Sequence, residues 1–312
     1  MNRYANPLTL KQREQHKARF GAALKSFAAG LQSHVSTEDG QWSIKGFIDV
    51  YKNIYTISAD TKIVSKILEI HLFPKILEFA EASGYKIVLA ECQNWYPDLS
   101  FVKAADERIK FAVDLKTTYR DPEYPGHVNG FTLGSHGAYF KDRSSKKNIQ
   151  FPYSQYLGHF SFGIIYTRVD GEAIDETRVL SVGELDDSVA GQKRIGVRQV
   201  TNVQSLRSIA SVVRDFQFFV CEKWQLASDR QGSGNTANIG SISCMEDVVK
   251  GNGVFARLGE KWFDEYWMNH GQTTMLKDGR SVKITKLKDF VQFKGGDVAL
   301  INRAASKRKQ AK

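Results

Sequence analysis

The segment "FAVDLKTTY", residues 111–119, has the apolar and β-branched composition of a strand but carries two charged residues near its middle. Because alternate side chains of a strand point to opposite faces, Phe111 and Leu115 share one face, while Asp114 and Lys116 lie together on the other. The apolar face predicts burial in a core. Asp114 and Lys116 therefore either neutralise one another or both serve a third charged group.

The stretches around this segment predict a compact antiparallel region. Residues 85–93, 98–104 and 108–119 are short, rich in branched and aromatic residues, and separated by residues typical of turns. Such stretches form strands that pair with their neighbours in the chain. The segment with Asp114 and Lys116 is therefore expected to lie inside a sheet.

Three helices are expected outside this region. Apolar residues recur at helical spacing among basic ones over residues 8–32, and residues 257–270 form an aromatic-rich helix. Another helix should begin at Asp60, a residue that caps helix N-termini, and end at Gly84. Pro74, in its middle, is expected to kink or divide that helix.

The remaining segments predict further strands and loops. Residues 41–58 alternate as a hairpin or two short strands, and residues 160–169 and 216–228 look like buried strands. Glycine and small polar residues make loops of residues 120–130 and 229–241. These elements together predict one α+β domain with a subdomain or arm on either side.

The expected division of the chain follows from these elements. Residues 1–40 form an N-terminal helical extension, residues 41–270 form the main domain, and residues 271–312 form a basic C-terminal arm or tail. The last eleven residues contain five basic residues and no acidic one. Tails of this composition are usually disordered.

Composition limits the class of protein. The chain has 312 residues, 42% of them apolar, and its 44 Lys and Arg against 34 Asp and Glu give a net charge of +10, which suggests a polyanionic partner. No window approaches the roughly 18 consecutive apolar residues of a membrane span, and the N-terminus lacks the apolar core of a secretory signal. The three cysteines show no CxxC spacing and support neither disulfides nor a zinc site. We therefore expect a cytoplasmic protein without a membrane partner.

Asp98 is a candidate for the third charged group. It stands at the start of a predicted strand, and a short hairpin over residues 99–107 would bring it beside Asp114. Two carboxylates held close together repel, and Mg²⁺ relieves that repulsion because it takes oxygen ligands. The carbonyl of Leu115 is another candidate ligand. Lys116 would then face water or phosphate at the metal, where its charge stabilises a developing oxyanion.

Simpler interpretations compete with this one. Asp114 and Lys116 are also explained as an ordinary ion pair on a sheet face, with Asp98 in an unrelated turn. Lys66 and Glu69 share one helical face and are also explained as a solvated charged stripe. The residue pattern alone leaves these alternatives open.

The motif and its surroundings resemble a known family. Pro97-Asp98 followed by Asp114-Leu115-Lys116 resembles the PD…(D/E)xK signature of nucleases. Further segments resemble the EcoRV-type restriction endonucleases in the same order: "SADTKIVSKILEI" (58–70), "QNWYPD" (93–98), "AVDLKTTY" (112–119), "YTRV" (166–169) and "GSGNTANIGSI" (232–242). The resemblance covers roughly residues 45–270. It implies an α+β, restriction-endonuclease-like core, a mixed β-sheet flanked by helices, with a subdomain for DNA recognition and dimerisation.

The resemblance also implies roles for individual residues. Asp98, Asp114 and the carbonyl of Leu115 would bind Mg²⁺, and Lys116 would assist the attacking water. Glu69 matches a helix acid that helps a further metal site, so it joins the catalytic set. The residues implied to contact DNA are Gln93, Asn94, Thr117, Thr118, Arg168, Gly232, Ser233, Gly234, Asn235, Thr236 and Asn238.

The loop over residues 232–241 suits base reading. Glycine lets a backbone approach base edges, Asn pairs with adenine, and the methyl group of Thr contacts that of thymine. A plain flexible loop or a phosphate cradle are the alternatives, although the absence of Lys excludes a P-loop. Two departures from the family stand nearby, because Ala237 occupies the place of a Thr and Cys92 that of a polar residue.

The implied function is that of a prokaryotic type II restriction endonuclease. It would cut both strands of double-stranded DNA bluntly at the palindrome GATATC, and a palindrome is most simply read by a homodimer. A repair or structure-selective nuclease is the first alternative. A sequence-specific DNA-binding protein without cleavage is the second, but a pure binder has no need of adjacent acids facing phosphate.

Overall fold

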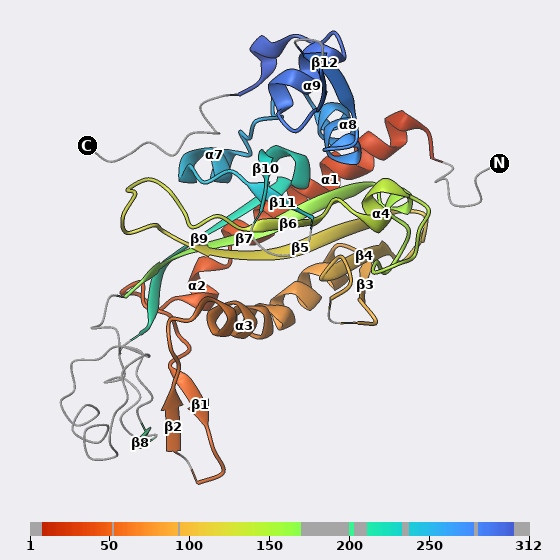
Figure 1. The fold of residues 1–312 in the computed structure, drawn as a ribbon. Coiled ribbons are helices and arrows are strands. Elements are labelled where there is room, and N and C mark those ends of the chain that lie inside the picture. The colour runs from red at the N-terminus through yellow and green to blue at the C-terminus, as the bar shows by residue number, and fades with distance from the viewer. Residues whose placement is uncertain are drawn as a thin grey trace.

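The computed structural model describes residues 8–51, 53–92, 94–169, 200–202, 211–232, 237–277 and 280–302 (Figure 1). Its helices are α1 (Leu10–Ala29), α2 (Gln32–Val35), α3 (Thr61–Ala82), α4 (Ala138–Lys141), α6 (Lys223–Leu226), α7 (Met245–Lys250), α8 (Glu260–Asn269) and α9 (Leu287–Phe293), with short 3₁₀ turns η1 (Tyr153–Gln155) and η3 (Val298–Leu300). Its strands are β1 (Gly46–Ile48), β2 (Asn53–Thr56), β3 (Tyr85–Leu89), β4 (Leu99–Lys103), β5 (Lys110–Tyr119), β6 (Thr132–Ser135), β7 (Gly158–Arg168), β8 (Val200–Asn202), β9 (Val213–Glu222), β10 (Ala227–Gln231), β11 (Asn238–Ser241), β12 (Thr274–Lys277) and β13 (Arg280–Lys283).

A five-stranded sheet forms the centre of the molecule. Its strand order is β3-β4-β5-β7-β9, and β5 lies between its antiparallel neighbour β4 and its parallel neighbour β7. The pairs β3 with β4 and β7 with β9 are antiparallel. The sheet is therefore mixed and helices flank it, which confirms the α+β, restriction-endonuclease-like architecture (Figure 1).

Both faces of the central sheet are buried. On one face, α1 and α3 cover the sheet, and the ring of Phe20 stacks on that of Phe111 with 4.2 Å between their centroids. On the other face, the small sheet β10-β11-β6 and helices α8 and α9 enclose a second core that includes Ala112 and Phe219. The alternation predicted for β5 is confirmed, because Phe111 and Ala112 belong to opposite cores.

Helix α3 follows the predicted bounds. Asp60 caps it by accepting hydrogen bonds from the backbone N–H groups of Lys62 and Ile63, and Gly84 follows its end with a φ of 71°. Of the two outcomes expected at Pro74, a kink or a division, the division is wrong, because α3 is continuous through this residue. Leu72 and Ile76, on either side of it, are buried in the same core and hold the helix together.

The predicted strand 216–228 is wrong in its second half. Strand β9 ends at Glu222, where a reciprocal cap forms because the N–H of Glu222 donates to the side chain of Gln225 at 2.9 Å. This cap starts the short helix α6, and the chain then enters β10 in the second sheet. The predicted loop 229–241 is accordingly shorter, since β10 and β11 occupy its two ends.

Two hairpins extend from the central body. Strands β1 and β2 pair antiparallel and form a three-stranded sheet with β8, and this sheet projects from the body below α3 (Figure 1). Strands β12 and β13 form a second hairpin next to α9. Among the described residues, no helix combines the length and apolar character needed to span a bilayer.

Candidate active site

The antiparallel pair β4 and β5 brings Asp98 to Asp114. Leu99, the first residue of β4, pairs with Val113, so Asp98 lies one step beyond the end of the ladder. The N–H of Leu115 donates to Oδ2 of Asp98 at 2.7 Å. The carboxyl groups of Asp98 and Asp114 also share a hydrogen bond, so the hairpin produces the expected contact.

Lys116 completes the group. Its Nζ lies 2.5 Å from Oδ2 of Asp114, and Asp114 is only 7% exposed. The two side chains share the face of β5 opposite Phe111 because they are two residues apart in a strand. Asp98, Asp114 and Lys116 therefore form one connected cluster at the end of β4 where the strand begins, next to Leu99.

The three groups hold unequal charges. Although Asp98 as a residue is exposed, crowding by protein around its carboxyl group and the negative charge of Asp114 raise its pKa to about 7. Burial opposes ionisation of Asp114, but the ammonium of Lys116 outweighs burial and lowers the pKa of Asp114. Burial also opposes the charge on Lys116, and Asp114 outweighs it and raises the pKa of Lys116. Asp98 is therefore the residue of the cluster whose carboxyl group gains and loses its proton near neutral pH.

The oxygen atoms of this cluster fit a hard divalent cation. In a strand, the N–H and C=O of one residue point to the same edge. The carbonyl of Leu115 is therefore directed toward the side where Asp98 lies, beyond the end of β4. Two repelling carboxylates and a carbonyl are the ligand types that Mg²⁺ accepts, and a cation would relieve the repulsion that raises the pKa of Asp98.

Glu69 stays apart from the two aspartates. It lies on α3 and forms an ion pair with Lys66, with 2.7 Å between Oε2 and Nζ. Its charge still contributes to the raised pKa of Lys116. Within the described ranges, no three or more His, Cys, Asp or Glu side chains are grouped closely enough to hold a metal. The ion pair between Glu69 and Lys66 is the contact expected if these residues form a solvated charged stripe on the helix.

Lys223 is a charged residue near the site that the sequence interpretation missed. It is 3% exposed, and its Nζ has no hydrogen-bond partner among the described residues. The ammonium lies 5.0 Å from the ring centroid of Tyr96 and 5.2 Å from that of Phe140. Burial lowers its pKa to about 7, and the charge of Asp114 partly opposes this shift. In the sequence, the only indication of this residue was a lysine within the largely apolar stretch 216–228.

The residues implied to contact phosphates mostly have partners within the protein. Thr118 is buried and its hydroxyl donates to the carbonyl of Asn129, whereas Thr117 is half-buried. Arg168 donates from Nη2 to the hydroxyl of Thr61 at 2.8 Å and lies over the ring of Tyr119. These contacts tie the end of β7 to the start of α3.

The residues expected to read DNA lie on two segments that are described only in part. Residues 232–237, called the recognition loop below after their expected role, join β10 to β11, and the N–H of Gly232 donates to the carbonyl of Asn238 at 2.9 Å. Asn94 is exposed. The remaining expected contacts lie outside the described residues: Gln93, Ser233, Gly234, Asn235 and Thr236.

The fold and the cluster together define a class. A mixed sheet that presents two aspartates and a lysine from adjacent strands is the arrangement of the PD-(D/E)xK nucleases. Residues 38–198 and 191–295 match the family described as restriction endonuclease EcoRV. The chain is also 32% identical over 267 residues to the type II restriction enzyme EcoRV of Escherichia coli, an alignment that covers 85% of this chain and 98% of that protein. The chain belongs to the EcoRV family of restriction endonucleases, and it is a type II site-specific deoxyribonuclease.

Proposed function

We propose that this protein cuts both strands of double-stranded DNA bluntly at the palindrome GATATC, using Mg²⁺. The contact of Asp98, Asp114 and Lys116 at the end of β4 is the observation that carries the catalytic part of the proposal. The likeness of the recognition loop to that of the family supports the DNA sequence. Ala237, where the family has a Thr, is the one departure inside that loop.

Asp98, Asp114 and the Leu115 carbonyl would hold Mg²⁺. When bound, the metal supplies Lewis-acid stabilisation of charge on the phosphate. Lys116 directs its ammonium at the attacking water and the phosphate oxygens, where a fixed positive charge stabilises the transition state. The oxygen of water forms a bond to phosphorus and loses a proton, while the bond to the 3′ oxygen breaks and that oxygen gains a proton. The products are a 5′-phosphate and a 3′-hydroxyl, without a covalent intermediate.

Glu69 is proposed to support the catalytic group from α3. Its charge acts on Lys116, but its carboxylate is paired with Lys66 at 2.7 Å. A role at a further metal ion therefore requires Glu69 to exchange Lys66 for the metal. Binding of DNA provides phosphates with which Lys66 can pair instead.

We assign the contacts with bases mainly to the recognition loop, and the contacts with phosphates to residues in and near β5. Gly232, Ser233, Gly234, Asn235, Thr236 and Asn238 would read base edges in the major groove, and Gln93 and Asn94 would reach the minor groove. Thr117, Thr118 and Arg168 would contact phosphates. The hydroxyl of Thr118 already donates to a carbonyl, so its contact would use the backbone or require that bond to change.

A homodimer is proposed because the site is palindromic. The hairpin formed by β1 and β2 exposes a row of large apolar side chains that a lone soluble subunit would leave in water. Among them, Ile48 is 62%, Val50 88% and Tyr51 83% exposed. A second copy that covers this hairpin would place two catalytic clusters on the two strands of one duplex.

The experiment is cleavage of plasmid DNA by the purified protein with Mg²⁺, followed by sequencing of the ends. Blunt ends at GATATC support the proposal. Cuts at another fixed hexamer would support the nuclease activity but refute GATATC as the recognition sequence. Cutting of branched or mismatched DNA without a fixed sequence, or binding without cutting, would refute the proposal.

A further inference from the structure

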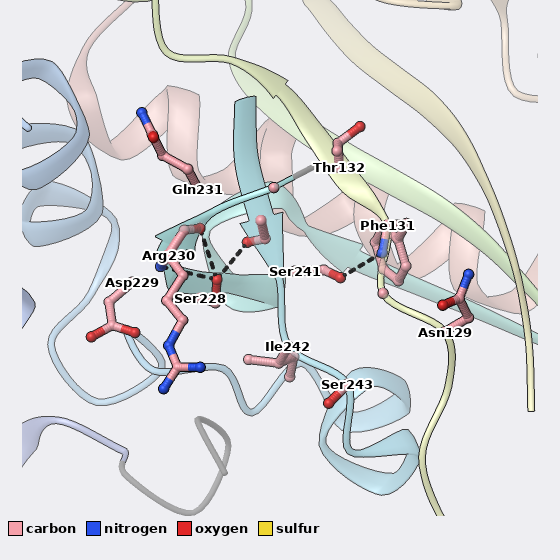
Figure 2. Close-up of a pocket in the computed structure, with 13 residues that line it drawn as sticks. Asn129, Phe131, Thr132, Ser228, Asp229, Arg230, Gln231, Ser241, Ile242 and Ser243 are labelled. Carbon is pink, nitrogen blue, oxygen red and sulfur yellow. Dashed lines mark hydrogen bonds between the residues drawn. The ribbon is translucent and has the colours of Figure 1, made fainter. Parts of the chain in front are cut away.

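A cavity of about 420 Å³ lies beside Gly232, the first residue of the recognition loop (Figure 2). Residues 129–132, 228–232 and 240–243 line it, so β6, β10 and β11 all contribute. Gly232, at the start of the recognition loop, and Gly240, in β11, both border the cavity. Any group that occupies this space would therefore touch the base of the segment that reads DNA.

Packing and hydrogen bonds fix the walls of the cavity. The hydroxyl of Ser228 donates to the carbonyl of Gly240 at 3.1 Å, and that of Ser241 accepts from the N–H of Phe131 at 3.0 Å. A Cβ atom on Gly232 would come within 2.7 Å of a methyl carbon of Thr132, so the strands meet closely there. The hydroxyls of Ser228 and Ser241 are thus already bonded within the protein.

Arg230 is the cation of the cavity. It is exposed, and its guanidinium has no hydrogen-bond or ion-pair partner in the part of the chain that the structure describes. The side-chain amide of Asn129 borders the opposite side of the cavity and likewise lacks such a partner there. Asp229 also lines the cavity, but it forms no ion pair with Arg230, and its carboxylate points away from Asn129 in Figure 2.

We propose that this cavity binds a phosphate of the DNA backbone just outside the recognised bases, with Arg230 as its cation. The proposal rests on the proposed function, because it takes double-stranded DNA as the substrate. A guanidinium offers a phosphate two parallel hydrogen bonds in addition to its charge. The cavity therefore fixes the position of the loop along the duplex while the loop itself reads bases.

The length of the loop favours a phosphate over a base as the partner of Arg230. A strand rises about 3.3 Å per residue, so Arg230, two residues before Gly232, lies about 7 Å behind the first residue of the recognition loop. The major groove of DNA is about 8.5 Å deep. When the loop touches base edges at the floor of the groove, Arg230 is at the rim, where the phosphates are.

The first test compares the salt dependence of DNA binding for Arg230→Gln, Arg230→Lys and wild type. Each lost phosphate contact lowers the slope of log affinity against log salt by about 0.9. For specific and nonspecific duplexes alike, we expect the magnitude of this slope to be smaller in Arg230→Gln than in wild type by about 0.9. The slope of Arg230→Lys should be close to that of wild type. Arg108→Gln is the control, because it removes the same charge at the turn between β4 and β5, far along the strand from Asp98.

The second test locates the phosphate. Duplexes that carry a single neutral methylphosphonate at successive positions outside GATATC should bind wild type several-fold more weakly at one position on each strand, and Arg230→Gln should not respond there. An unchanged salt slope, or no sensitive position, would overturn the proposal. A relaxed preference for a neighbouring base pair at unchanged slope would also overturn it, since Arg230 would then read a base. If wild type neither binds nor cuts DNA, the proposed function itself fails, which distinguishes the two outcomes.

Discussion

Asp114 and Lys116 show how a strand in the middle of a sheet tolerates two charges. An unpaired buried ion costs several kcal/mol, and the 2.5 Å contact between these side chains removes most of that cost. Asp98 then carries the remaining repulsion, which appears as its raised pKa. A change to one residue of the cluster is therefore expected to shift the pKa values of the other two.

Catalysis and recognition should separate at the level of single residues. We expect Asp114→Ala to retain binding to GATATC but to lose cleavage by at least about 10²-fold, because a proposed metal ligand and the ion-pair partner of Lys116 are both lost. Asn235→Ala should instead lose discrimination, by about 1–3 kcal/mol against DNA with one altered base pair. Cleavage kinetics and binding titrations on matched duplexes measure both effects. Equal, partial activity of the two variants would contradict these assignments.

The titration of Asp98 and Lys223 should give the free energy of unfolding of the metal-free protein a minimum near pH 7. Asp98 holds its proton up to about pH 7 in the folded state but only to about 3.8 when unfolded, so its contribution falls as pH rises between these values. Lys223 loses its proton near pH 7 when folded but near 10.5 when unfolded, so stability rises with pH above 7. Denaturant unfolding across this pH range measures the profile.

Variants assign the two sides of this profile. Asp98→Asn should remove the fall on the acid side, because an amide does not titrate, and Lys223→Met should remove the rise on the alkaline side. Subtracting each variant's profile from that of wild type cancels the other titrating groups. Parallel profiles for wild type and both variants would contradict the shifted pKa values.

The packing between β7 and β9 is the most sensitive contact between elements. Gly163 of β7 pairs with both Lys116 and Phe219, and a Cβ atom on Gly163 would lie 1.9 Å from the ring of Phe219. We expect Gly163→Ala to reduce the free energy of unfolding by about 1–3 kcal/mol or more, because the ring has to move inside a packed core. Gly30→Ala is the control, since its nearest atom would be 3.5 Å away. A comparable loss in both variants would refute this explanation.

The sequence predicted the elements that carry strong local signals. Asp60 and Gly84 mark the ends of α3, and the alternation in residues 111–119 predicts both the strand and its charged face. Helix α6 could not be predicted because its four residues are too few for a helical pattern, and its start depends on the cap between Glu222 and Gln225. Local signals specify single elements, whereas contacts between distant elements specify where the chain changes sheet.

The group of residues expected to carry catalysis was predictable for a related reason. Asp98, Asp114 and Lys116 lie on one hairpin, so their contact depends on nearby residues. Lys223, in α6, is held near the charge of Asp114 by contacts between elements that lie far apart in the chain. Glu69 is also near in space, but its pairing with Lys66 is a property of one helix face and competes with any metal role.

At the scale of the whole molecule, the β1–β2 hairpin should control assembly. We expect Ile48→Asp to shift the protein from dimer to monomer in light scattering and to abolish coordinated cleavage of both strands, because a charge would replace an apolar contact. Leu276→Asp is the control, since Leu276 is 79% exposed on β12, in the other hairpin. A wild type that is monomeric with and without DNA would refute the proposed dimer.

Helix α1 ties the beginning of the chain to the catalytic strand, through Phe20 on Phe111 and through Lys17, which pairs with Glu222 and Glu260. During synthesis this helix leaves the ribosome long before any of those partners has been translated. Its apolar side must then wait, exposed to chaperones or to other nascent chains, until the central sheet has been completed. This helix is thus made before its partners and reaches its final place only after they have been made.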